Sequence, residues 1–400
     1  MEKKFIHFGC WNQGYCDKDN KTPISKVMSR LEKTLKTKTK HDFVVIAGDN
    51  YYPNKPEKTE KTEKTEKTEK KVKEGKTIIQ ANLESGFNCL PNDIEINIIL
   101  GNHDLETSTK KKKIYIENAT KEEGGDCLIM QLEKNIVSKR NKKDNKFSLD
   151  LYKHKWLGKN TLLLMIDTSM YDIDDAIAFL PCYNVKTGKE YKSIQELHHE
   201  QQDFVDRMID QYNKRIENVI VIGHHPISGY KYKNEINNLI HSFPGLMELF
   251  LSIRLKLITK KINYYYLCAD LHLYQIGTVT VKDTLNAQPI MSIKQYIVGT
   301  GGTKLDDSPF LKSELRLPDD TACLKSENLE AIYEMTPEQI SLSTSEKYGF
   351  LECELYKSQM YFKFIDTDGK KYLEHDNIIR RNITRRSSSR SSRSKTLKNK

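Results

Sequence analysis

The sequence predicts an α/β fold built on a layered sheet, and three observations support this. Short, almost continuously apolar segments end in glycine, as strands covered on both faces of a sheet do. Segments with helical spacing of apolar residues separate them. Polar residues gather where the apolar segments end. In α/β sheets, binding sites form at the carboxyl ends of the strands, so we expect the chemistry there.

The segments that we expect to form strands are short and rich in β-branched residues. Four of them end in glycine: KFIHFG (4–9), FVVIAG (43–48), INIILG (96–101) and NVIVIG (218–223). Two similar segments, NTLLLMID (160–167) and NYYYLCAD (263–270), end in aspartate instead. Helices are expected between the strands, for example at PISKVMSRLEKTLK (23–36), at 193–216 and at GLMELFLSIRLKLI (245–258).

The composition indicates a normal core diluted by polar segments. The chain has 400 residues, of which 37% are hydrophobic and 30% charged, enough for one large domain or two smaller ones. EKTEKTEKTEKT (57–68) repeats with a period of three that fits neither a sheet face nor a helical stripe. We therefore expect one domain over 1–375, a charged low-complexity insertion at about 53–77, and a disordered basic Ser/Arg-rich tail at 376–400.

The net charge of +10 is unevenly spread, because much of it lies in Lys110 to Lys113 and in the tail. The eight cysteines form no CxxC pair and no zinc-finger spacing. The N-terminal residues enter a strand pattern without the apolar stretch of a signal peptide, and no run is long enough to span a membrane. The sequence therefore predicts an intracellular, cytoplasmic protein with reduced thiols and no membrane segment.

Candidate functional residues follow four of the expected strands. They are Asp49, Asn50, Tyr51 and Tyr52 in GDNYY, Asn102, His103 and Asp104 in GNHD, His224 and His225 in GHHP, and Asp270 and His272 in ADLH. Each alone is more often a turn or cap residue than a ligand, and His225 is more simply explained by packing beside Pro226. Together they predict a site for divalent metals, which a shared carboxylate would make binuclear.

The order of these motifs resembles the calcineurin-like metallophosphoesterases, most closely their purple acid phosphatase (tartrate-resistant acid phosphatase type) branch. Further segments agree with that branch: MIDTSMY (165–171), EQQDFVDRMI (200–209), YIVGTGGTKLDD (296–307) and a closing hairpin at 348–370. The resemblance covers about residues 3–372, interrupted by the EKT insertion. It implies a four-layer α/β/β/α sandwich of two mixed sheets with two metal ions at the strand ends.

The resemblance also implies an activity and site residues. It implies a metal-dependent phosphatase or phosphodiesterase that uses two divalent ions, zinc, manganese or iron, and acts on a phosphorylated substrate. His103, oriented by Asp104, would lie over the phosphate and assist the leaving group, and Asp49 would bridge the ions. The positions that match the family's metal ligands are Cys10, Asp49, Tyr52, Asn102, His224, Asp270 and His272.

Two positions depart from the family pattern. Gly9-Cys10-Trp11-Asn12 stands where the family usually has Gly-Asp-Trp-Gly, and Ala269-Asp270-Leu271-His272 stands where it has Gly-His-x-His. In one interpretation both substitutes are ligands, and the Cys10 thiolate favours zinc or ferrous iron. In the other, Cys10 is a buried hydrophobe, Asp270 is a cap, and the chain is a weak or inactive relative kept for binding. The other matching positions favour a retained metal site, whereas catalysis stays open.

The tail raises a separate hypothesis about partners. RRSSSRSSR could contact nucleic acid weakly through phosphate charge, be phosphorylated, or remain a solvated segment. The sequence identifies neither the substrate nor the oligomeric state, because loops set specificity in this fold.

Overall fold

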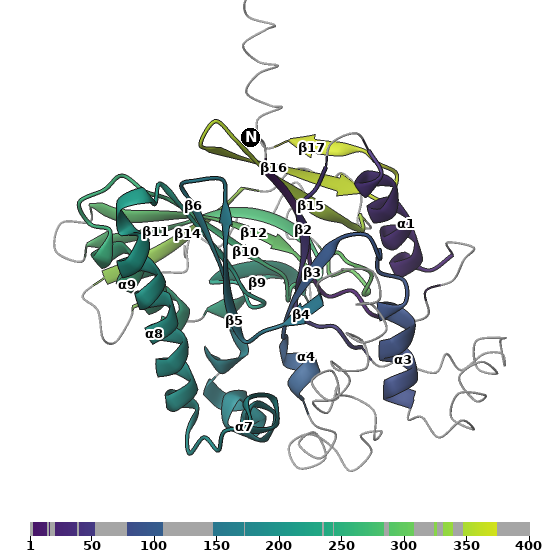
Figure 1. Cartoon of the computed structure of the whole chain (residues 1–400), viewed down its shortest axis with the longest axis horizontal. Coiled ribbons are helices and arrows are strands. Elements are labelled where there is room, and N and C mark those ends of the chain that lie inside the picture. The colour runs from purple at the N-terminus through teal and green to yellow at the C-terminus, as the bar shows by residue number, and fades with distance from the viewer. Residues whose placement is uncertain are drawn as a thin grey trace, which may run out of the picture.

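Two β-sheets pack face to face between layers of helices in the computed structural model (Figure 1). The predicted EKT insertion and the tail lie outside the described residues, so the division of the chain into one domain, an insertion and a tail stays a prediction. The structure describes residues 3–13, 16, 21–37, 40–52, 78–106, 147–171, 173–233, 236–242, 244–283, 288–307, 324–325, 331–338 and 347–373.

The first sheet has the order β17-β16-β15-β1-β2-β3-β4. Its parallel half brings together segments far apart in sequence, since β1 pairs with β2, β2 with β3 and β3 with β4. Its other half is the antiparallel hairpin that the sequence predicts at the end of the chain. The strands are β1 (Lys3–Phe8), β2 (Phe43–Ala47), β3 (Glu95–Ile99), β4 (Phe147–Leu149), β15 (Gly349–Tyr356), β16 (Gln359–Asp366) and β17 (Lys371–Leu373).

The second sheet has the order β13-β14-β11-β12-β10-β7-β6-β5. Strands β6, β7, β10 and β12 are parallel, and antiparallel strands flank them on both sides. The strands are β5 (Tyr152–Leu157), β6 (Thr161–Ile166), β7 (Asn218–Ile222), β10 (Asn263–Cys268), β11 (Tyr274–Asp283), β12 (Pro289–Val298), β13 (Leu324–Lys325) and β14 (Ala331–Glu338). A separate hairpin joins β8 (Ser228–Lys233) to β9 (Ile236–Ser242).

Helices cover the outer faces of both sheets. Figure 1 shows α1 and α3 on one side of the strands and α8 and α9 on the other. The helices are α1 (Pro23–Leu35), α3 (Ile78–Phe87), α4 (Asn102–Leu105), α7 (Ile173–Thr187), α8 (Ile194–Tyr212) and α9 (Pro244–Lys256), with the short 3-10 turns η2 (Ser169–Tyr171) and η3 (Asn213–Arg215). The predicted four-layer sandwich of two mixed sheets is therefore confirmed.

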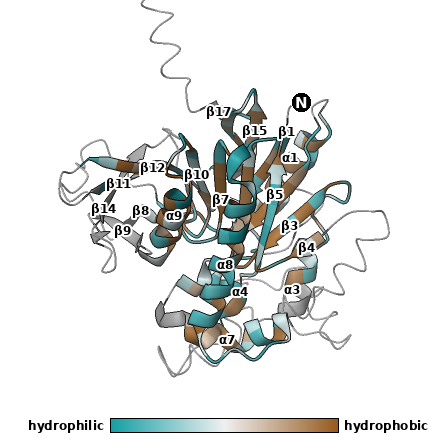
Figure 2. Cartoon of the chain, turned by 60° about the vertical axis from the view of Figure 1, so that its left-hand side comes forward, coloured by the Kyte–Doolittle hydropathy of each residue, from teal (hydrophilic) through white to brown (hydrophobic). Residues whose placement is uncertain are grey.

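Aromatic side chains fill the space between the sheets. The ring of Phe362, on β16, lies 5.1 Å from that of Tyr265 and 4.3 Å from that of Tyr296. His7, on β1, reaches across to the Cys268 carbonyl on β10, 3.1 Å from its Nε2. Strands in the middle of the sheets carry many hydrophobic residues, whereas much of α8 is hydrophilic (Figure 2). These contacts fix how the carboxyl ends of the two sheets face each other.

The state of the cysteines differs from the sequence-based prediction. Cys16 and Cys89 form a disulfide, and Cys182 is also disulfide-bonded, whereas Cys10, Cys268 and Cys353 are free and buried. The prediction of reduced thiols is therefore wrong for Cys16, Cys89 and Cys182. Separation along the chain hides such a pairing, because Cys16 and Cys89 are 73 residues apart. Within the described residues, none of the helices is both long and apolar enough to cross a membrane.

Candidate metal centre

The candidate residues lie at strand ends of both sheets. Cys10, Asp49, His224 and Asp270 each come two residues after the last residue of β1, β2, β7 and β10, respectively. Asn102 begins the short helix α4 after β3. Because the parallel strands of each sheet end on the same edge, and the two edges meet, the loops bring these side chains into one cluster.

Three of these residues adopt a backbone conformation that side chains rarely tolerate. The φ angles of Cys10, Asp49 and Asp270 are 51°, 51° and 57°. In the described part of the chain, the other non-glycine residues with positive φ are Lys357 and Ser358, in the turn between β15 and β16. A left-handed residue outside a hairpin turn costs about 1 kcal/mol or more and persists where the surroundings hold it. The strain is therefore concentrated at this cluster.

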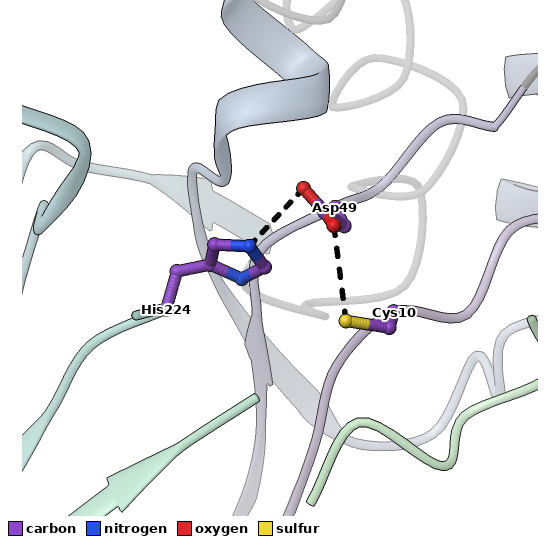
Figure 3. A group of neighbouring side chains, drawn as sticks. All are labelled: Cys10, Asp49 and His224. Atoms are coloured by element: carbon purple, nitrogen blue, oxygen red, sulfur yellow. Dashed lines mark hydrogen bonds and ion pairs between the residues drawn. The ribbon is translucent and has the colours of Figure 1, made fainter. Parts of the chain in front are cut away.

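Asp49 lies at the centre of the cluster, and its two oxygens face different neighbours (Figure 3). The Cys10 Sγ is 3.8 Å from Oδ2, which also accepts a hydrogen bond from the Tyr52 hydroxyl. On the other side, Oδ1 lies 3.2 Å from His224 Nε2 and accepts a hydrogen bond of 3.1 Å from the backbone N–H of His103. One carboxylate thus connects two groups of donor atoms.

The first group contains Cys10, Tyr52 and His272. The Tyr52 hydroxyl is 2.9 Å from His272 Nε2. The other ring nitrogen of His272 lies 2.9 Å from the Lys304 carbonyl, and its backbone N–H donates to Asp306. Since Nδ1 then carries the proton, Nε2 turns its lone pair toward Tyr52.

The second group contains His224, Asn102 and Asp270. His224 Nε2 is 3.2 Å from Asn102 Oδ1 and 3.7 Å from Asp270 Oδ1. Its Nδ1 donates to the Ala47 carbonyl at 2.7 Å, which fixes the ring so that Nε2 points into the cluster. His225 is buried next to His224. One potential ligand atom from each of His224, His225 and Asp270 lies within 4.8 Å of the other two.

Asp104 makes hydrogen bonds to the loops that surround the cluster. Its oxygens accept hydrogen bonds from the backbone N–H groups of Asn50 and Gly101 and from the Asn50 side chain, at 2.8–2.9 Å. The imidazole of His103 instead has Glu106 Oε2 3.2 Å from its Nδ1, and packs on the Tyr52 ring with 4.8 Å between the centroids. Asp104 thus braces the loop that carries Asp49, and the orientation of His103 by Asp104 stays a prediction.

Charges within the cluster favour ionised Asp49 and protonated neighbours. The pKa of Asp49 is lowered although burial acts against this, because His224 and His103 lie beside it. Burial lowers the pKa of His224, but the Asp49 carboxylate outweighs it and raises the value to about 9. Burial and then Asp49 raise the pKa values of Cys10 and Tyr52 well above their ordinary range. Without a cation, the thiol and the phenol therefore keep their protons.

The donor set fits divalent metal ions. A thiol, two carboxylates, a phenol, imidazoles and an amide oxygen converge on a buried site, and the ligand atoms of Cys10, Asp49 and His224 lie within 4.8 Å of one another. Sulfur and nitrogen donors suit zinc or ferrous iron, and oxygen donors broaden the choice to manganese. A bound cation would displace the thiol and phenol protons, so we expect affinity to rise with pH.

Supporting residues around the cluster were not identified from the sequence. The Trp11 indole N–H donates to Asn50 Oδ1 at 3.0 Å, and thereby ties the loop after β1 to the loop after β2. Thr168 Oγ1 accepts from the backbone N–H groups of both His224 and His225, at 3.0 and 2.9 Å. Trp11 and Thr168 belong to sequence motifs named above, but only their contacts in the folded chain show which loops they connect.

Comparisons with known proteins identify a family, and the solved structures that match include a distant one. Residues 3–274 match a family model described as calcineurin-like phosphoesterase. A solved structure entitled "Structure of PhoD" matches with 11% identity and a TM-score of 0.40, over 98% of this chain and 78% of that chain, a likeness too distant to support an inference. No curated protein matches the chain.

Proposed function

The chain belongs to the calcineurin-like phosphoesterase family, and on this premise we propose that it is a metal-dependent hydrolase of phosphoric esters, a phosphatase or a phosphodiesterase. The family binds two divalent metal ions, and the cluster around Asp49 is where this chain would hold them. The observation that carries the proposal is the position of Asp49, with one oxygen toward Cys10 and Tyr52 and the other toward His224.

We assign the ligands of the two ions from these contacts. Cys10, Tyr52 and His272 would complete one shell and Asn102, His224 and Asp270 the other, with Asp49 shared between them. When bound, such a pair of ions supplies a nucleophilic water at neutral pH and neutralises phosphoryl charge. The left-handed conformations of Cys10, Asp49 and Asp270 support this assignment, because strain of this kind collects at functional sites.

His103 would contact the substrate rather than a metal. Its backbone N–H is bonded to Asp49, while its ring is partly exposed, with 26% of the side-chain surface accessible. Glu106, beside Nδ1, would favour the imidazolium form of His103, in which Nε2 also carries a proton that it could donate to the leaving group. Glu106 is in this respect a positioning residue.

We further propose that the chain is closest to the purple acid phosphatase branch, with an altered metal. The order of GDNYY, GNHD and GHHP supports the branch, which the family match does not distinguish from others. A thiolate at Cys10 would reduce a ferric ion, so zinc or ferrous iron fits this centre better. Cys10 and Asp270 would then take the places of the family's aspartate and histidine ligands, so that each metal ion keeps its full set of ligands.

Metal content and hydrolysis of an aryl phosphate test the proposal together. We expect close to two ions per chain after purification with zinc, manganese or ferrous iron, and turnover that chelation abolishes. Asp49→Asn should lower turnover at least about 100-fold, because it weakens both shells. The control Asp93→Asn changes an exposed aspartate and should leave turnover unaltered. No bound metal and no turnover in the wild-type protein would refute the proposal.

One observation favours the alternative of a weak or inactive phosphatase-like protein with a structural or binding role. Cys10 is fully buried, and burial followed by the Asp49 charge raises the pKa of its thiol, so the side chain stays protonated as that of a small core residue does. The variant Cys10→Asp separates the two possibilities. A marked gain in metal-dependent hydrolysis would indicate a degraded site, whereas a loss would indicate that the thiolate is a working ligand.

A further inference from the structure

A second polar hollow lies at the opposite end of the second sheet from the metal centre. It has a volume of about 470 Å³, the size of small-molecule sites, and it opens where β10 begins, at Asn263 and Tyr264. Asp270 lies beyond the other end of the same strand, about 20 Å away at 3.3 Å per residue. A ligand in this hollow would therefore not touch the metal centre.

The described lining of the hollow carries positive charge and no acidic residue. Arg254 comes from the last turn of α9, Lys260 and Lys261 from the loop that follows, and Lys294 from β12. A comparable hollow beside α1, of about 370 Å³, also contains lysines, but there Glu352 pairs with Lys363 at 2.5 Å. No acidic residue is among the described residues that line this hollow together with Arg254, Lys260 and Lys261, which favours an anionic ligand.

Two buried donors in this hollow have no hydrogen-bond partner among the described residues. They are Nη1 of Arg254 and the hydroxyl of Tyr264, whose side chain belongs to a residue only 6% exposed. A buried donor without a partner costs about 1–3 kcal/mol, so such atoms are usually satisfied by a ligand or water. The two donors line the same hollow and could bind the same oxygen-rich group.

The strand geometry explains why Tyr264 faces this hollow. Successive side chains of a strand point to opposite faces. Tyr265 packs against Phe362 of the first sheet, and Tyr266 packs against Phe250 of α9 with 5.6 Å between the rings. Tyr264 therefore lies on the α9 side, beside Arg254. Burial raises the pKa of Tyr264 to about 12 although Arg254 opposes this, so its hydroxyl remains a donor.

We propose that this hollow is a binding site for a small ligand that carries phosphate groups, separate from the metal centre. The Arg254 guanidinium and the Tyr264 hydroxyl would bind phosphate oxygens directly, because a guanidinium fork matches the geometry of two such oxygens. Lys260 and Lys261 would supply further positive charge from the rim. A phosphate-bearing ligand fits better than a single carboxylate, because Arg254, Lys260 and Lys261 together bring more than one positive charge to the hollow.

Titration calorimetry with inorganic pyrophosphate tests the site, in the full chain with EDTA so that no metal contributes at Asp49. We expect saturable binding that weakens as salt is raised. Arg254→Met should raise the Kd at least about tenfold, as expected for the loss of a charge-assisted hydrogen bond. Tyr264→Phe removes only the hydroxyl and keeps the ring, so it should raise the Kd about threefold without unfolding the protein.

A matched pair of lysine variants separates the site from general charge. Lys261→Met, at the hollow, should weaken binding, whereas Lys26→Met, an exposed position on α1, should not. The proposal is wrong if wild-type protein shows no saturable binding at millimolar pyrophosphate. Equal Kd values for wild type, Arg254→Met and Tyr264→Phe would also overturn it, as would binding of a single-stranded oligonucleotide through Arg254 without binding of pyrophosphate. Aryl phosphate turnover, measured separately with metal, reports on the proposed function and not on this site.

Discussion

Cys10 is a buried thiol 3.8 Å from a carboxylate, and these surroundings determine what it can do. Burial and the Asp49 charge keep the proton on sulfur, so the side chain is a poor nucleophile on its own. A cation between the two groups would reverse this preference, because a coordinating thiol loses its proton. The thiol of Cys10 would therefore be unreactive without a metal ion and would act as a ligand when one binds.

Replacing Cys10 tests its role as a ligand. We expect Cys10→Ser to weaken zinc binding at least about tenfold, because a hydroxyl is a poorer zinc ligand than a thiolate. Cys353→Ser, at another free and buried cysteine on β15, is the matched control and should leave zinc affinity unchanged. Competition with a chromophoric chelator measures both. Equal affinities for the two variants would contradict the assignment of Cys10.

His7 is not one of the proposed ligands, and its burial makes the stability of the fold depend on pH. Burial lowers the pKa of His7 to about 4, although the hydrogen bond to Cys268 opposes this. An unfolded histidine titrates near 6.5, so between these values the unfolded state binds more protons and stability falls as pH falls. The folded state begins to lose stability as the pH falls below about 6.5, and this loss is complete below about pH 4. The free energy of unfolding decreases by about 3 kcal/mol over this range.

Urea unfolding of metal-free protein at pH 7 and pH 4 measures this effect. We expect His7→Gln to reduce the difference in unfolding free energy between the two pH values by about 3 kcal/mol. His199→Gln, at an exposed position on α8, should retain the wild-type difference. An unchanged pH dependence in His7→Gln would show that another group causes the acid loss.

At the level of elements, the glycines at the strand ends allow the close approach of the loops. A Cβ on Gly48, at φ 78°, would lie 2.4 Å from His224 Nδ1. A Cβ on Gly101 would lie 2.4 Å from both the backbone nitrogen and Oδ1 of Asp49. At these strand ends a side chain would collide with the neighbouring loop, and at Gly48 the positive φ also favours glycine.

Two alanine variants separate packing from backbone strain. Gly48 and Gly188 both have positive φ, but a Cβ on Gly188 would meet no atom within 4 Å. We expect Gly188→Ala to cost about 1 kcal/mol of stability and to leave metal binding intact. Gly48→Ala should displace His224 and lower metal affinity as well as stability. The contrast fails if both variants bind metal as the wild type does.

The elements recovered from sequence are those with a continuous apolar pattern. Predicted strands at 4–9, 43–48, 96–101 and 218–223 agree with β1, β2, β3 and β7 to within about two residues. The hairpin β8–β9 and helix α7 were not predicted, and α7 contains Pro181, which weakens a helical pattern. Strand β5 was also missed, because five of its six residues are only half-buried and its sequence YKHKWL is largely polar.

On the scale of the whole molecule, one covalent link joins parts far apart in sequence. Cys16, in the loop after β1, is bonded to Cys89, just beyond α3. The same region is held by Trp11, whose ring meets the edge of Phe87 at 5.4 Å. The loop that carries Cys10 is thus attached to the helix layer by a disulfide and by packing.

Removing this link should lower the stability of the whole chain. A disulfide that closes a loop of 73 residues lowers the conformational entropy of the unfolded chain. This stabilises the folded state by about 4 kcal/mol. We expect the double variant Cys16→Ser/Cys89→Ser to lose about that amount in urea unfolding without reductant. Cys353→Ser provides the comparison for replacing a cysteine that forms no disulfide. A double variant as stable as that single variant would show that the link constrains little.

The sequence by itself determined the layered α/β fold and the set of polar residues at the strand ends. Both follow from local physics: apolar runs must be buried on two faces, and the chain turns where they stop. Asp49, Asn102, His224 and Asp270 could therefore be named without coordinates. The family resemblance supplied their expected roles.

The tertiary structure decided which of these residues meet and through which atoms. Only the packing of the two sheets shows that Asp49 faces Cys10 with one oxygen and His224 with the other. The same packing places Asp104 where it accepts a hydrogen bond from Asn50, and it brings Cys16 next to Cys89. It also places Arg254 and Tyr264 in a hollow at the far end of β10. Contacts of this kind join residues tens to hundreds of positions apart, and no periodicity in the chain encodes their distances or directions.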